Sequence, residues 1–268
     1  MEITDSAWYN KRYLVKNHLS YLLDLEDPMK HPFRFSLLPF FTMGAGGLGL
    51  ALRLWLFSAA DDRGLFPPAH PANSSIYILT ALTLGILFLA TGNLTPRRVN
   101  RQHLQIISTC AYAIGGLGLI LTAVWNLAGS NAKLAWVAVA ASVIGGLAML
   151  FMAALKFTRK QLPYWLPAIL TVVLMLDTVA QCQVWGSVPQ LQVYFFPLLA
   201  SIFLILTAYH KTVFAARKNN ARLLAFFSQG ALFFCCLSLN TTQWPLYFGM
   251  LFWAAVQMYP CMLVKKEA

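Results

Sequence analysis

Long apolar blocks, separated by short polar segments, repeat along most of this chain. Each block has about 17 to 25 residues, the length at which an α-helix crosses the roughly 30 Å hydrocarbon core of a bilayer. Apolar residues occupy all faces of the blocks, as in helices that contact lipid or other helices all round. The pattern predicts eight membrane-spanning helices, at residues 35–57, 76–92, 104–127, 134–155, 162–185, 191–209, 223–239 and 244–264.

The segment before the first block has a different pattern. Trp8, Val15, Leu19 and Leu22 recur at helical spacing, and basic residues lie on the other faces. This is typical of an amphipathic helix that lies on the membrane surface or packs against the ends of the spans. We therefore predict an all-α, polytopic integral membrane protein with three parts: an amphipathic N-terminal arm (1–34), an eight-span transmembrane domain (35–264) and a C-terminal tail (265–268).

The basic residues predict how the spans are oriented. All Lys and Arg residues except Arg53, Arg63 and Lys133 fall on one side of the eight predicted spans. Short loops rich in Lys and Arg remain in the cytosol, so we expect both termini there, in the plasma membrane or, in a eukaryote, the endoplasmic reticulum membrane. Because this topology accounts for the net charge of +11, the lipid bilayer is the expected partner and nucleic acid is not.

Composition leaves few residues that could carry chemistry. Only 11% of the chain is charged, against about 25% in an ordinary soluble domain. Asp177 is the one acid inside a predicted span, and a carboxylate at such a depth costs at least ~2.5 kcal/mol unless it has a partner or a function. Arg53 lies in the same half of the membrane, so we predict an ion pair between Arg53 and Asp177.

Other polar residues gather on the predicted outer side. Gln181 follows Asp177 by one helical turn and shares its face, and an outer loop adds acids and a histidine. Two interpretations stay open: an outward-facing site for a small polar solute, or a structural ion pair in a scaffold, sensor or accessory subunit that serves a protein partner or a second copy. The candidate site comprises Arg53, Asp177, Gln181, Asp61, Asp62 and His70.

Motifs of known catalytic chemistry are missing from the sequence. It has no HExxH, no GxSxG and no P-loop, so no catalytic residue, cofactor or metal ion is expected. Asp61, Asp62 and His70 could hold a metal ion, but their spacing matches no specific metal-binding motif. An intramembrane enzyme is the weakest hypothesis, because no nucleophile and base are evident.

Glycine pairs recur in three spans, as Gly46-Gly47, Gly115-Gly116 and Gly145-Gly146. They could mark a repeat of helical hairpins, or they could let helix backbones approach closely. We favour close packing, because many membrane bundles use glycine in this way.

Overall fold

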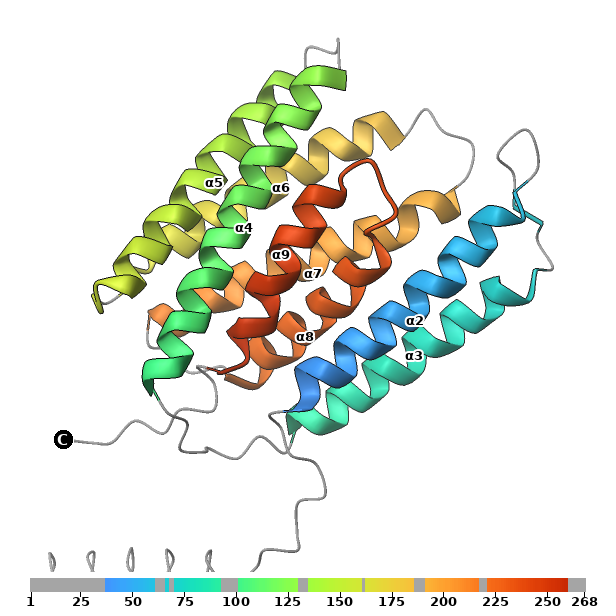
Figure 1. Cartoon of the computed structure of the whole chain (residues 1–268), viewed down its shortest axis with the longest axis horizontal. Coiled ribbons are helices and arrows are strands. Elements are labelled where there is room, and N and C mark those ends of the chain that lie inside the picture. Colours follow the sequence, from blue (N-terminus) through green and yellow to red (C-terminus); the bar gives the residue numbers. More distant parts are fainter. Residues whose placement is uncertain are drawn as a thin grey trace, which may run out of the picture. The chain divides into compact units, whose positions relative to one another are not determined.

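The computed structural model describes residues 37–60, 66–67, 70–92, 101–129, 135–160, 162–185, 191–216 and 221–259. The predicted arm, the predicted tail, Asp61 and Asp62 lie outside the described residues. Within those residues the secondary structure is helical, without strands (Figure 1). The helices are α2 (Leu38–Ser58), α3 (Pro71–Gly92), α4 (Arg101–Gly129), α5 (Ala135–Phe157), α6 (Trp165–Trp185), α7 (Leu191–Ala215), α8 (Ala221–Leu237) and α9 (Trp244–Gln257).

Six of the helices, α2 to α7, are long and apolar enough to cross a membrane. They indicate a helical membrane protein, the class that the hydrophobic pattern predicts. In the described part of the chain, α8 has 17 residues and α9 has 14. At 1.5 Å per residue these lengths are roughly 25 and 21 Å, less than the hydrocarbon core of about 30 Å. A total of eight membrane crossings therefore stays a prediction.

Helices that follow each other in sequence run antiparallel, and each such pair except α3 and α4 packs side by side (Figure 1). Near the start of α4, the amide of Gln105 donates a hydrogen bond of 2.7 Å to the carbonyl of Lys156, close to the end of α5. We call the end of the bundle at which α4, α6 and α8 begin the basic end. Its described basic side chains are Lys156, Arg159, Lys160, Lys211 and Arg222.

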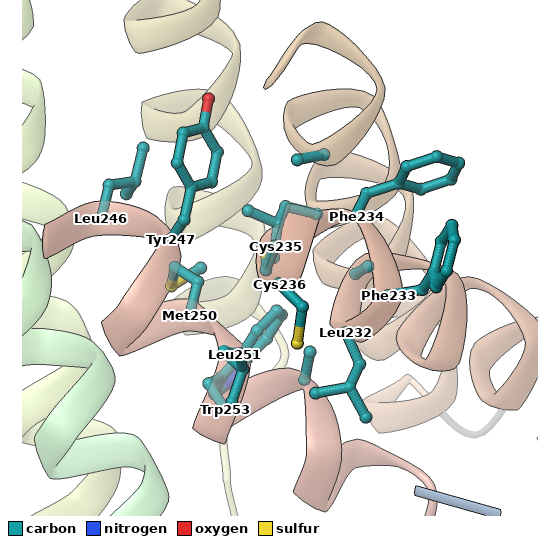
Figure 2. Packing of buried hydrophobic residues seen from close by; sticks show 14 of the residues in the cluster. Leu232, Phe233, Phe234, Cys235, Cys236, Leu246, Tyr247, Met250, Leu251 and Trp253 are labelled. Carbon is teal, nitrogen blue, oxygen red and sulfur yellow. The ribbon is translucent and has the colours of Figure 1, made fainter. Parts of the chain in front are cut away.

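The two short helices are the most enclosed. Helix α8 packs against α2, α3, α7 and α9, and α9 packs against α4, α7 and α8. Every residue of α8 from Ser228 to Leu237 is buried. Figure 2 shows part of this core, including Cys235 and Cys236 of α8 and Met250 of α9. Because protein surrounds these helices, their lengths need not match the thickness of the bilayer.

Glycine permits the closest helix contacts. A Cβ atom on Gly118 of α4 would lie 2.8 Å from the Cα of Gly249 in α9. One on Gly116 would lie 2.9 Å from the carbonyl oxygen of Gly146 in α5. Side chains at these positions would push the backbones apart, so the prediction of close packing is confirmed for Gly116 and Gly146, whereas Gly47 has open space beside it.

Candidate functional site

The turn between α8 and α9 lies deeper than the ends of α2 and α6, at the end of the bundle opposite the basic end. We call the region around Arg53, Asp177, Gln181 and Gln243 the recess. Arg53, five residues before the end of α2, reaches the carbonyl of Leu237, the last residue of α8. Gln181, four residues before the end of α6, contacts Gln243 at the end of the turn. These contacts lie roughly 6 to 8 Å below the ends of α2 and α6. Backbone at such a depth requires polar partners from the protein or from water.

Arg53 supplies two of those partners. Its guanidinium donates hydrogen bonds to the carbonyls of Leu237, at 2.6 Å, and Val193, at 2.7 Å. Leu237 lacks a helical partner because α8 ends there. Val193 lacks one because the residue four positions on, Pro197, has no N–H. Arg53 thereby links α2 to α7 and α8 at two carbonyls that the helices leave unpaired.

The predicted ion pair between Arg53 and Asp177 does not form in the structure. Besides the two carbonyls, the rings of Phe57 and Phe196 lie 5.4 and 5.7 Å from the guanidinium carbon. Two fixed carbonyl dipoles and two aromatic faces therefore stabilise the buried cation without a carboxylate. Arg53 is 2% exposed, and two backbone carbonyls and two aromatic rings take the place of the carboxylate that the sequence analysis predicted as its partner.

Asp177 lies in the same recess with a different set of contacts. Its Oδ2 accepts a hydrogen bond from Nε2 of Gln181, which also donates to Oε1 of Gln243. The carboxylate is 1% exposed, and its Oδ1 and the Oε1 of Gln181 are buried without a hydrogen-bond partner. Two acceptor oxygens without donors are costly in a buried place, and they suit a ligand that donates hydrogen bonds.

Tyr247 of α9 contacts α7 four residues beyond Val193, whose carbonyl Arg53 binds. Its hydroxyl donates to the carbonyl of Pro197 at 3.3 Å and lies 3.4 Å from Oγ of Ser201. Figure 2 shows the ring extending from α9 with the hydroxyl at its tip.

Sequence reasoning missed Tyr247 and Gln243. A tyrosine in an apolar span and a glutamine in a loop carry no signal by themselves. The place of Gln243 beside Gln181 depends on which helices are neighbours, and hydropathy does not give that order.

Of the other predicted site residues, the structure describes His70, whose contacts are with Trp55 and Ala72. The Nδ1 of His70 accepts a hydrogen bond of 3.3 Å from the amide of Ala72, and its ring packs edge-on against Trp55 at 5.0 Å. Asp61 and Asp62 lie outside the described residues. Among the residues that are described, no group of three or more His, Cys, Asp or Glu side chains is placed to hold a metal ion.

An apolar groove of about 740 Å³ runs between α5 and α6. Trp136, Trp165 and Val172 line it and are exposed on the surface of the bundle. In a membrane such a surface faces lipid tails, so the groove is not a site for a polar ligand.

No family model, curated protein or solved structure matches this chain.

Proposed function

We propose that this protein is a non-enzymatic membrane protein that binds a small polar solute in the recess around Asp177. The observation that carries the proposal is the pair of buried acceptor oxygens, Oδ1 of Asp177 and Oε1 of Gln181, which have no donor. A solute that presents several N–H donors, such as ammonium or a small primary amine, would satisfy both oxygens. A monovalent metal cation is the simplest ligand of the same charge.

The charges around the recess favour a cationic ligand. Asp177 is the only acidic residue in the part of the chain that the structure describes. Arg53, the nearby cation, is occupied by two carbonyls and does not pair with the carboxylate. A positive ligand would therefore neutralise a carboxylate that the protein itself leaves without a counter-ion.

Thermal unfolding of the purified full-length protein in neutral detergent tests this proposal. The probes are sodium, potassium, ammonium, methylamine and a set of amino acids, compared at constant ionic strength. We expect at least one cationic probe to raise the unfolding midpoint of the wild type, and Asp177→Asn to abolish the rise. Asn retains the shape of Asp and can still accept the hydrogen bond from Gln181, so the variant should fold.

A matched control lies on the same helix. Gln183 is exposed, and Gln183→Ala should keep the full response of the wild type. The proposal is wrong if no cationic probe stabilises the wild type, or if Asp177→Asn retains the response.

A membrane scaffold or accessory subunit is the second candidate. The contacts of Arg53 favour it. Arg53 and Asp177 together suggested a site, but Arg53 binds carbonyls of α7 and α8 and so holds helices together. This alternative predicts that a membrane protein partner or a second copy co-purifies at fixed stoichiometry, and that Asp177→Asn leaves the assembly intact.

A further inference from the structure

Asp177 is almost fully enclosed, so a solute reaches it only if part of the protein moves. Its side chain is 1% exposed, and that of Gln181, one helical turn farther along α6, is 4% exposed. Leu176 and Val179, which lie on other faces of α6, are exposed on the outside of the bundle. Asp177 therefore points into the bundle, and the route to it depends on the side chains that precede and follow it along the inward face of α6.

Toward the basic end, this inward face is apolar. Helix α6 begins at that end, and Leu166, Leu170 and Leu174 recur there at helical spacing, each of them buried. Leu204 and Ala208 of α7, which packs against α6, belong to the same apolar core. A polar solute that crossed this core would lose its hydration without gaining new partners. The basic end is therefore an unfavourable direction of entry.

Toward the opposite end, polar side chains connect Asp177 with the surface. The Nε2 of Gln181 donates to Oδ2 of Asp177 and to Oε1 of Gln243, so one amide group joins both residues. Gln243 is half-buried, and its neighbours Thr242 and Trp244 are exposed. Asp177, Gln181 and Gln243 thus form a continuous polar connection from the recess to the surface of the turn between α8 and α9.

The side chain of Gln243 has no role in its own helix. It occupies the N-terminal cap of α9, where a side chain commonly accepts a hydrogen bond from the first turn, but it makes no such bond. The amide of Trp244 is paired with the carbonyl of Thr241, and Pro245 has no N–H. The contact with Gln181 is therefore an interaction between helices that α9 does not need in order to begin.

A contact of this kind opens at a small cost. It joins two uncharged side chains with several rotatable bonds through one hydrogen bond. Because Gln243 is half-buried, water can replace the partner that Gln181 loses when the contact breaks. Leu170 and Leu174, by contrast, are buried in the packed core. The contact between the two glutamines is therefore the easier one to open.

We propose that Gln181 and Gln243 form a gate, through which the recess exchanges its solute with the end of the bundle opposite the basic end. Gln181 is the moving part, because its amide contacts both Asp177 and Gln243. Gln243 is a positioning residue that holds the gate closed. What passes the gate rests on the proposed function, whereas the gate itself can be tested without any solute.

Thiol labelling measures whether position 177 is reached past Gln243. Asp177→Cys, in the full-length protein with its native cysteines replaced, is treated in neutral detergent with a charged, membrane-impermeant methanethiosulfonate. Gln243→Ala should raise the rate of labelling by about tenfold, because the closed gate loses its hydrogen bond. Thr242→Ala, a change at an exposed neighbour in the same turn, should leave the rate unchanged.

A second cysteine position separates opening of the gate from general loosening. Ser142→Cys is a nearly isosteric change at a buried position of α5, and its labelling should stay slow in both backgrounds. Because Asp177→Cys lacks the carboxylate, its labelling does not depend on a bound solute, so the gate and the proposed function can fail separately. If Asp177→Cys does not fold, modification of Asp177 by a water-soluble carbodiimide, located by peptide mass spectrometry, carries the same comparison.

Labelling across a membrane tests the side of access. In the Gln243→Ala background, the reagent should reach position 177 from the side that labels Ser58→Cys, an exposed position at the end of α2. It should not reach it from the side that labels Thr158→Cys, an exposed position at the basic end. The proposal is wrong if position 177 reacts from the basic side, if Gln243→Ala leaves its rate unchanged, or if the rate at position 142 rises by the same factor.

Discussion

At the scale of single residues, Arg53 shows how a charge is accommodated in an apolar bundle without a counter-ion. Pro197 removes the N–H that would pair with the carbonyl of Val193, and the end of α8 frees the carbonyl of Leu237. One guanidinium satisfies both, since its planar group carries several donors in fixed directions. The guanidinium and the two unpaired carbonyls each supply the hydrogen-bond partner that the other would otherwise need from water.

The shared carbonyl of Val193 should couple the effects of substitutions at Arg53 and Pro197 on the unfolding free energy. Arg53→Met should cost about 2 to 4 kcal/mol in unfolding free energy, because two buried carbonyls lose their donor. Pro197→Ala restores an N–H to Val193, so the cost of Arg53→Met should fall by about 1 kcal/mol in that background. Denaturation by SDS titration in mixed micelles measures both values.

Asp177→Asn, combined with Arg53→Met, provides the control for this double-mutant cycle. Arg53 and Asp177 share no contact, so their effects on the unfolding free energy should add. A large coupling between them, with none between Arg53 and Pro197, would contradict the structure.

At the scale of helices, glycine contacts hold α9 against α4. A Cβ on Gly118 would lie 2.8 Å from the carbonyl oxygen of Pro245 as well as from the Cα of Gly249. These are backbone atoms, which cannot turn aside as a flexible side chain can. Small residues are needed here because membrane helices associate largely through packing.

We expect Gly118→Ala to destabilise the protein by about 1 to 3 kcal/mol, the usual cost of forcing atoms into a packed interface. Gly47→Ala provides the matched control, because nothing lies within 4 Å of a Cβ at that position. That change should be neutral or stabilising by up to about 1 kcal/mol, since alanine favours the helix. Unfolding in mixed micelles compares the two; equal losses would rule out the contact with α9.

At the scale of the whole molecule, the two ends of the bundle differ in charge. The basic end carries Lys156, Arg159, Lys160, Lys211 and Arg222. Four exposed tryptophans lie at the opposite end (Trp55, Trp125, Trp136 and Trp244) and one, Trp165, lies at the basic end, as expected for indole rings that anchor helices at both membrane surfaces. We propose that the basic end faces the cytosol and that the protein resides in the plasma membrane.

Cysteine labelling tests this orientation. In a cysteine-free background, a membrane-impermeant maleimide should label Ser58→Cys in intact cells and Thr158→Cys only after permeabilisation. Both positions are exposed, at opposite ends of the bundle. Labelling of both from the same side, or in the reverse order, would contradict the proposed orientation.

The sequence by itself determined the class of protein, the positions of the six long helices and the placement of Gln181 on the same face as Asp177. These features depend on hydropathy over a window of about 20 residues and on spacing within one helix, so they are local. The partners of Arg53 are not local: Val193 and Leu237 lie 140 and 184 positions away. Only the tertiary structure decided these contacts, because spans that are apolar on every face carry no periodicity from which helix order could be read.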